Sequence, residues 1–182
     1  MKILLLTPLY PPEISEPAPY IKKLAELLNE KNINTTIITY SLIPEKITGV
    51  KIISINKHLP LLLRLSLFTI KLFFESFKTD IIYSQNGASV ELPLLIISKF
   101  TRKPYIIRKG DALAYEKASQ NRYIKNIQRL TFGNAYKIIK ETPLKKPELT
   151  PFKEVSLEDH SRYKNSWENH SGMLIETFKN AK

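Results

Sequence analysis

The first forty residues switch between two apolar patterns that belong to different kinds of secondary structure. Residues 2–7 are apolar without alternation, which is typical of a strand buried on both faces of a sheet. A proline-rich loop follows, and Pro19 suits the first turn of an amphipathic helix over residues 19–31. Residues 35–40 are rich in threonine and isoleucine and predict the next strand. Strand, helix and strand in this order predict a parallel sheet with a crossover helix.

The same alternation continues through the next hundred residues. Right-handed crossovers between the strands predict one Rossmann-like, doubly wound parallel sheet, so the expected fold class is α/β. Ligands of such sheets bind beyond the carboxyl ends of the strands. The further strands are expected over residues 50–55, 80–84, 104–107 and 136–139, and the further helices over residues 59–78, 91–100 and 122–132.

A change of composition near residue 140 divides the chain. Residues 1–140 are expected to form the Rossmann-like domain. Residues 141–160 contain three spaced prolines and predict an extended linker. Residues 161–182 are expected to hold a C-terminal helix over 161–179, and its few apolar side chains predict that it docks on the sheet domain.

The apolar character of residues 59–78 admits two interpretations. Arg64, Lys71 and Glu75 would be costly in the middle of a bilayer, so the segment is a poor candidate for a membrane span. The polar residues form one narrow stripe of the expected helix, which leaves a broad apolar face. We expect that face to belong to the core, and attachment to a membrane surface is the alternative.

Charge and composition limit the classes of function. The formal net charge is +11, and residues 100–140 carry ten basic and two acidic side chains. Such a segment could face the phosphates of a lipid, a sugar nucleotide or a nucleic acid, or could be ordinary solvated surface. The chain has no cysteine and three scattered histidines, so no metal site is expected. The phosphate-binding and nucleophile motifs of nucleotide hydrolases, dehydrogenases and serine hydrolases are also missing from the sequence.

The N-terminus does not resemble a secretory signal. The apolar run after Met1 and Lys2 is short and is not followed by a small-residue cleavage site. We therefore expect a cytoplasmic protein, with attachment to the inner face of the membrane as an extension of that expectation.

Several segments together resemble the N-terminal domain of the family-4 glycosyltransferases, which have the GT-B fold. The resemblance covers residues 1 to about 146, through KILLLTPLYPPE, YIKKLAELLNEKN, TTIITY, DIIYSQN, LPLLIISKFTRKPYIIRKGD and YIKNIQRLTFGNAYKIIKETPLKK in this order. The resemblance implies an acceptor-side domain that faces a second, donor-binding domain across a cleft. A nucleotide sugar is the implied co-substrate, and the implied reaction is the transfer of a hexosyl group to an acceptor.

The sequence departs from that family at two points. The loop after the first strand usually carries a Gly-Gly pair that approaches the donor phosphates, but here Ser15 and Glu16 take its place. Their side chains, and the negative charge of Glu16, argue against normal phosphate binding. The donor-binding domain also appears in none of the 182 residues, whose tail weakly resembles the closing helix of the family.

The candidate site residues follow the expected strands. The match places Asp111 near an acceptor-facing polar position, where its carboxylate could orient an acceptor hydroxyl or accept its proton, although Asp after Gly110 is also common in turns. Arg108 and Lys109 could bind the phosphate of an anionic acceptor or be plain surface charge. Gln85 and Asn86 could hydrogen-bond sugar hydroxyls or form a simple loop.

The leading hypothesis is therefore a glycosyltransferase-like acceptor-side domain that is inactive alone and binds no cofactor by itself. Its expected partners are a separate donor-binding subunit and an anionic membrane surface or lipid-linked acceptor. The alternative is a non-catalytic binding module or degenerate remnant of a glycosyltransferase. A basic nucleic-acid-binding domain is less well supported, because no basic motif interleaved with aromatic residues is present.

Overall fold

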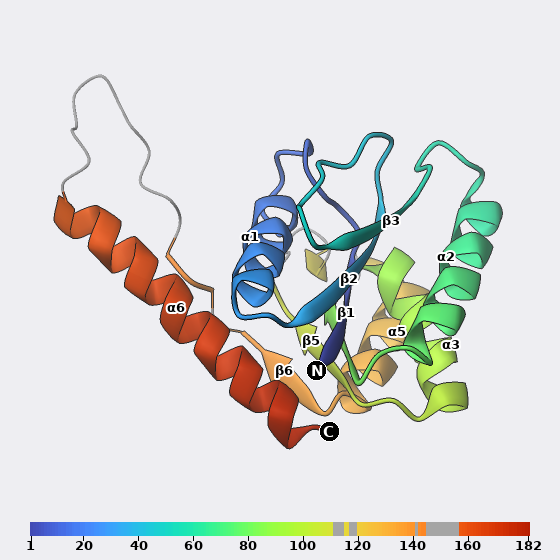
Figure 1. Cartoon of the computed structure of the whole chain (residues 1–182). Coiled ribbons are helices and arrows are strands. Elements are labelled where there is room, and N and C mark those ends of the chain that lie inside the picture. The colour runs from blue at the N-terminus through green and yellow to red at the C-terminus, as the bar shows by residue number, and fades with distance from the viewer. Residues whose placement is uncertain (111–114, 117–119, 141, 145–156) are drawn as a thin grey trace. The chain divides into compact units, whose positions relative to one another are not determined.

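A computed structural model gives the arrangement of the chain (Figure 1). It describes residues 1–110, 115–116, 120–140, 142–144 and 157–182. The chain divides into two compact units, one of residues 1–140 with 181–182 and one of residues 141–180. Each unit is considered by itself.

The first unit contains one parallel sheet of six strands, in the order β3-β2-β1-β4-β5-β6. This order reverses between β1 and β4, which is where open α/β sheets form their ligand crevice. The α/β, Rossmann-like fold class predicted from the sequence is confirmed. The strands are β1 (Lys2–Thr7), β2 (Asn34–Tyr40), β3 (Lys51–Ile55), β4 (Ile81–Gln85), β5 (Tyr105–Arg108) and β6 (Lys137–Ile139).

Helices cover both faces of this sheet. Helix α1 (Pro17–Glu30) lies on one face, and α2 (Leu61–Ser76), α3 (Ala88–Thr101) and α5 (Arg122–Gly133) lie on the other (Figure 1). Helix α3 packs against both α2 and α5. Asn121 caps α5, because its side-chain oxygen accepts hydrogen bonds from the backbone N–H groups of Tyr123 and Ile124.

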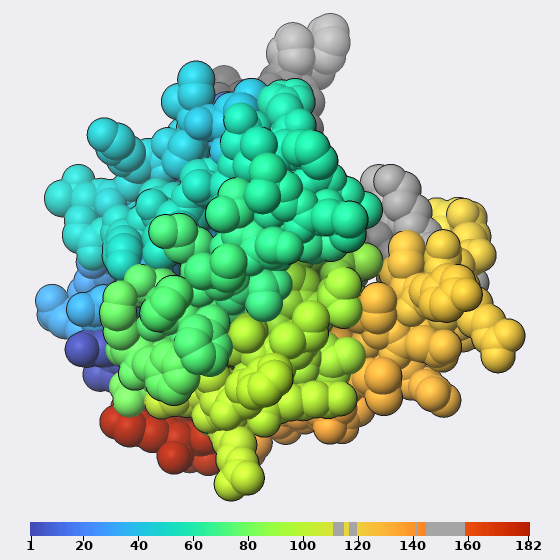
Figure 2. All heavy atoms as spheres, turned by 90° about the vertical axis from the view of Figure 1, so that its right-hand side faces the viewer, coloured from blue at the N-terminus to red at the C-terminus, as the bar shows by residue number. Residues whose placement is uncertain are grey.

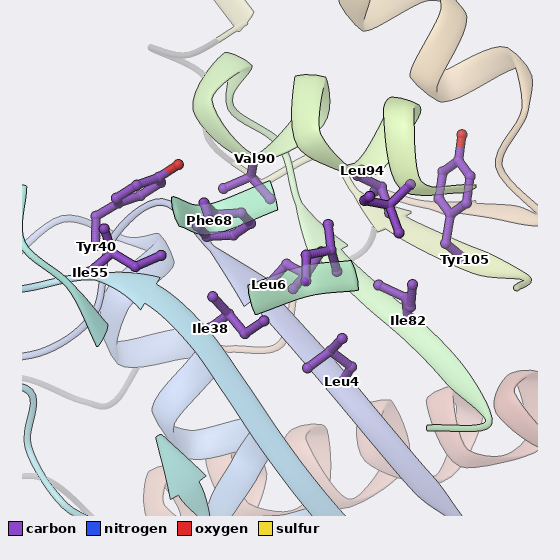
Figure 3. Packing of buried hydrophobic residues seen from close by; sticks show 12 residues of the cluster. Leu4, Leu6, Ile38, Tyr40, Ile55, Phe68, Ile82, Val90, Leu94 and Tyr105 are labelled. Atoms are coloured by element: carbon purple, nitrogen blue, oxygen red, sulfur yellow. The ribbon is translucent and has the colours of Figure 1, made fainter. Parts of the chain in front are cut away.

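The core between the sheet and the helices α2 and α3 is apolar (Figure 3). Alternate residues of each strand point to this side, as the two-residue period of a strand requires. Leu4 and Leu6 of β1 contribute to it, and Phe68 of α2 stacks on the ring of Tyr40 with the ring centroids 4.9 Å apart.

A proline inside α3 is compensated by a side chain of the sheet. Pro93 has no N–H, so the helix cannot supply the usual donor to the carbonyl of Ser89 four residues earlier. The hydroxyl of Tyr40 donates to that carbonyl at 2.9 Å. The tyrosine thus satisfies a backbone acceptor that the sequence of the helix leaves open.

We expect Tyr40→Phe to lower the free energy of unfolding by about 1–2 kcal/mol, because the Ser89 carbonyl loses its donor. Tyr10→Phe is the matched control. The Tyr10 hydroxyl is buried and has no hydrogen-bond partner within the described part of the chain. Its removal should leave the stability unchanged or raise it by up to about 1 kcal/mol. Urea unfolding of the two variants checks this difference, and equal losses would contradict it.

The structure corrects the prediction that the broad apolar face of residues 59–78 belongs to the core. Only Phe68 and Leu72 among the apolar residues of α2 are fully buried. Ile70, Phe74 and Leu62 of the same helix are at least half exposed. The sheet contributes one contact stripe to each helix, and the apolar surface of α2 is wider than that stripe.

The second unit is dominated by α6 (Leu157–Asn180), which begins earlier than the expected helix over residues 161–179. The indole N–H of Trp167 donates to the carbonyl of Leu144 at 3.2 Å. The backbone N–H of Leu144 donates to the hydroxyl of Ser166 at 3.0 Å. These two bonds hold residues 142–144 against the middle of the helix. The predicted docking of this helix on the sheet domain stays a prediction.

Candidate functional site at the carboxyl edge of the sheet

Three strand ends lie in one row across the carboxyl edge of the sheet. The register pairs Leu6 with Ser84 and Gln85 with Arg108, so Thr7, Gln85 and Arg108 are neighbours on β1, β4 and β5. The Thr7 hydroxyl lies 3.2 Å from the side-chain oxygen of Gln85 and donates to the Leu9 carbonyl at 2.6 Å. The Gln85 amide N–H donates to the carbonyl of Pro17 at 3.1 Å. These bonds fix the loop between β1 and α1 over the sheet edge.

Arg108 is the largest side chain buried in this row. Its guanidinium donates to both carboxylate oxygens of Glu16, over 2.7 Å from Nη2 and 3.4 Å from Nη1. The other side of the guanidinium lies over the Tyr20 ring, 3.6 Å from the ring centre. The Arg108 side chain is 1% exposed, whereas that of Glu16 is 33% exposed. The arginine is therefore held on one side by a carboxylate and on the other by an aromatic face.

The electrostatics of this pair favour the charged arginine. Burial by itself lowers the pKa of Arg108, but the hydrogen bond that it donates to Glu16 and the neighbouring tyrosines outweigh burial and raise the pKa. Glu16 also directly precedes α1, where the positive end of the helix dipole favours a carboxylate. An internal anion thus occupies the position beside Arg108.

Two buried tyrosines complete the surroundings of Arg108. The hydroxyl of Tyr20 on α1 and the hydroxyl of Tyr83 on β4 lie 2.7 Å apart. Burial raises the pKa of Tyr20 to about 12, with a smaller opposing effect from Arg108. Burial likewise raises the pKa of Tyr83. Both phenols therefore stay protonated at neutral pH and act as neutral hydrogen-bonding groups.

Gly110 passes directly over the guanidinium. A Cβ atom added at residue 110 would lie 2.2 Å from Nη1 of Arg108, which is far inside the contact distance. The backbone N–H of Gly110 donates to the side-chain oxygen of Asn86 at 3.0 Å. The backbone N–H of Asn86 donates in turn to the carbonyl of Arg108. Glycine is needed here because the backbone and a buried side chain approach each other closely.

The other residues predicted for the site differ in accessibility. Gln85 and Asn86 are buried, whereas Lys109 and Gly110 are half-buried and Ser15 is exposed. The Lys109 ammonium lies 3.6 Å from the centre of the Tyr115 ring. Asp111, the predicted catalytic residue, lies outside the described residues. The assignment of these residues to acceptor binding stays a prediction.

Sequence reasoning missed the buried carboxylate of Glu91. Gly87 has a φ angle of +148°, and an added Cβ atom would meet the ring of Pro8 at 3.2 Å. Its backbone N–H donates to the Glu91 side chain at 3.0 Å. Burial raises the pKa of Glu91, although this bond and one to Gln128 oppose the rise. An acidic residue four positions after a glycine that starts a helix was the available signal.

The sequence also did not predict that Glu16 and Arg108 would meet. Glu16 was interpreted as repelling phosphate and Arg108 as attracting it, and the structure brings the two together. The available signal was their position, because Arg108 lies at the end of β5, Glu16 lies in the loop after β1, and the two strands end at the same sheet edge. Only β4 lies between β1 and β5, and an arginine side chain is long enough to reach across one strand.

Other features of the described residues lie apart from this row. A hollow of about 420 Å³ is lined by the proline-rich loop, the first half of α1 and Glu45, and none of the predicted site residues lines it. The described residues contain no group of three acidic, histidine or cysteine side chains arranged to hold a metal ion. The helices in the described part of the chain include none with the length and apolar content needed to cross a bilayer.

Comparison with known proteins identifies structural relatives only. No family model and no curated protein matches the sequence. The crystal structure of Anabaena Alr3699/HepE in complex with UDP is similar, with a TM-score of 0.53 and 18% identity over 91% of this chain. The same protein in complex with UDP and glucose gives a TM-score of 0.54 and 17% identity. The chain spans 41% of the length of those chains. The likeness supports the Rossmann-like α/β fold.

Proposed function

We propose that residues 1–140 are the acceptor-side domain of a glycosyltransferase of the family-4 type. The observation that carries this proposal is the strand order β3-β2-β1-β4-β5-β6 with polar residues gathered at the carboxyl ends of β1, β4 and β5. The likeness to HepE supports it, since that protein was crystallised with UDP and with UDP and glucose. Fold alone does not determine function, so the roles of individual residues need direct tests.

The proposal assigns the nucleotide sugar to a second domain. The loop before α1 carries the Glu16 carboxylate in place of a Gly-Gly pair, and this carboxylate already neutralises Arg108. A phosphate placed beside that loop would meet negative charge without a free cationic partner from this pair. A donor-binding domain outside residues 1–140 would therefore supply the contacts to the nucleotide. Closure of the two domains would align donor and acceptor.

The acceptor would bind above the β5 end of the row. Lys109 would attract a phosphate or other anionic group of the acceptor, such as a lipid-linked saccharide. Asp111 would orient the acceptor hydroxyl and take its proton. Gln85 and Asn86 would hold the loops in place, because their amides are buried and bonded to the backbone of neighbouring segments.

A direct binding experiment tests this assignment. Ligand-observed NMR with the full chain should detect binding of phosphorylated saccharides and should detect no binding of UDP-glucose. Lys109→Ala and Asp111→Asn should each weaken saccharide binding several-fold. Lys31→Ala, at the end of α1 and the opposite sheet edge, is the matched control and should have no effect. The proposal would be contradicted if UDP-glucose bound at the same edge and neither Lys109→Ala nor Asp111→Asn weakened that binding.

The alternative of a non-catalytic binding module has its own support. Under this alternative the Glu16–Arg108 pair would take the place of the donor phosphate, and the domain would need no second subunit. Adding a donor-binding domain would then restore no transfer, although saccharides would still bind. Transfer of a glycosyl group by the chain mixed with a donor-binding domain would favour the enzyme over the binding module.

A further inference from the structure

Three neighbouring helices present an unusually apolar outer surface, which we name the three-helix face. It consists of the solvent side of α2, α3 and α5, and Figure 2 shows these helices side by side on one side of the molecule. On α2, Leu63, Ile70 and Phe77 just after it recur every seven residues, so they lie on one helix side. The exposed apolar side chains of this face are Leu62, Leu63, Ile70, Phe74, Phe77, Ile96, Phe100, Tyr123 and Leu130.

The aromatic members are strongly exposed. Phe100 is 75% exposed, and Phe74 and Phe77 are 58% and 60% exposed. Each lies within a few residues of an exposed lysine, since Lys71 and Lys78 flank the first pair and Lys99 precedes Phe100. Single exposed apolar residues are common on soluble domains, but a set of this size across adjoining helices marks an interaction surface.

The exposed charged side chains of the three helices themselves are all basic. The exposed basic residues on the three helices and the turns after α2 and α3 are Lys71, Lys78, Lys99, Arg102, Arg122, Lys125 and Arg129. The acidic residues within the three helices are Glu75 and Glu91, and both are buried. Glu75 pairs with Lys78 at 3.0 Å, and Asp80 in the turn after α2 is half-buried. The three helices therefore expose cations and phenylalanines and no carboxylate.

From this combination we infer that the three-helix face docks on an anionic lipid surface. An apolar protein partner would cover the phenylalanines but would leave the cations unopposed. A nucleic acid would neutralise the cations but would leave the phenylalanines in water. A bilayer that contains acidic lipids meets both requirements, because the aromatic rings enter the boundary of the acyl chains while the lysines reach the phosphates.

The inference does not depend on the proposed function. The three-helix face lies on the side of the sheet away from α1, and the predicted acceptor residues lie at the carboxyl edge. Docking through it would leave that edge accessible to a substrate held in the same membrane. Failure of vesicle binding would leave saccharide binding at the edge unaffected, so the two proposals can fail separately.

Co-sedimentation of the full chain with vesicles tests the inference. Binding is expected to vesicles of phosphatidylcholine mixed with phosphatidylglycerol and to be far weaker with phosphatidylcholine alone. The triple variant Ile70→Ser, Phe74→Ser and Phe100→Ser should reduce the partition coefficient at least tenfold. Lys71→Glu with Lys99→Glu should reduce it by a similar factor, since each lysine near an anionic surface contributes roughly fivefold.

Matched variants distinguish docking from general stickiness. Ile14→Ser with Ile43→Ser removes isoleucines outside the three-helix face that are even more exposed, and Lys31→Glu removes a lysine outside it. These variants should bind vesicles like the unchanged chain. Circular dichroism should confirm that all variants are folded. The inference is overturned if the serine variants bind vesicles normally, if a nucleic-acid duplex binds in preference to anionic vesicles, or if the face proves to join two copies of the chain in solution.

Discussion

Replacing Glu16 by glutamine is expected to lower the free energy of unfolding by about 3 kcal/mol. The substitution keeps the shape of the side chain but removes the charge that faces a buried guanidinium. Arg108 is 1% exposed and cannot turn to water without leaving the Tyr20 ring. The value is placed at the lower end of the range for buried pairs, because the Glu16 carboxylate itself is one third exposed. Urea unfolding monitored by circular dichroism measures the loss.

Glu13→Gln is the control for this prediction. Glu13 lies in the same loop and pairs with Lys57 at 2.6 Å, but that lysine is 39% exposed. Its loss should cost less than about 1 kcal/mol, as for surface pairs in general. Replacing the pair together, Glu16→Leu with Arg108→Met, should recover most of the stability that Glu16→Gln loses. Equal losses for Glu13→Gln and Glu16→Gln would show that the burial of Arg108 has no energetic consequence.

Gly110→Ala tests the same Glu16–Arg108 pair by crowding the guanidinium of Arg108. The added methyl group would displace the guanidinium, so we expect a loss of more than about 2 kcal/mol in the unchanged chain. In the Arg108→Met background the methyl group has no guanidinium to meet, and the loss should be smaller. A double-mutant cycle measures this coupling. Additive losses would mean that Gly110 is required for another reason.

The sheet could be predicted from the sequence because its signal is local. Residues 2–7 and 35–40 could be predicted as strands, since their apolar and β-branched side chains fit a doubly covered sheet. The order of strands and helices then restricts the topology, because parallel crossovers are right-handed. The strand ends were within one residue of the structure, although Arg108 proved to belong to β5.

The site could be predicted only as a location. The carboxyl ends of parallel strands follow from the fold, and they directed attention to Gln85, Arg108 and Gly110, whose assignment to a site stays a prediction. Their contacts did not follow, because the Glu16–Arg108 pair joins residues 92 apart in sequence across an intervening strand. The donor for the Ser89 carbonyl likewise comes from Tyr40, which no helix pattern identifies. Such partners depend on packing, and a single sequence does not contain it explicitly.

The exposed apolar residues of α2 are a second feature that the sequence did not predict. Hydrophobic periodicity identified the helix and its polar stripe, but not which of its apolar residues the sheet would cover. A helix contacts a sheet along one stripe, so Phe68 and Leu72 are buried while Phe74 on the same helix stays in contact with solvent. Apolar composition therefore predicted the helix correctly and its burial only in part, because Phe68 and Leu72 lie in the core with Leu67 and Phe73 packed against it.

High pH should unfold the sheet domain steeply through its buried tyrosines. Burial raises the pKa of Tyr20 and of Tyr105 to about 12, and it raises the pKa of Tyr10, Tyr40 and Tyr83 as well. Below about pH 10 the phenols are protonated in both states, and the free energy of unfolding does not depend on them. Above that pH the unfolded chain releases protons that the native chain retains, so stability falls as pH rises.

The expected size of this effect exceeds that of any substitution. Each such tyrosine contributes a slope of about 1.4 kcal/mol per pH unit between its unfolded and its folded pKa. Over about two pH units, five tyrosines could remove on the order of 10 kcal/mol, which is comparable with the whole stability of a domain. Urea unfolding at a series of pH values measures the slope. Tyr105→Phe should reduce this slope by the contribution of about one proton, which distinguishes the tyrosines from lysines that titrate in the same pH range. A free energy of unfolding that stays level up to about pH 12 would show that these phenols ionise as readily in the native chain as in the unfolded one.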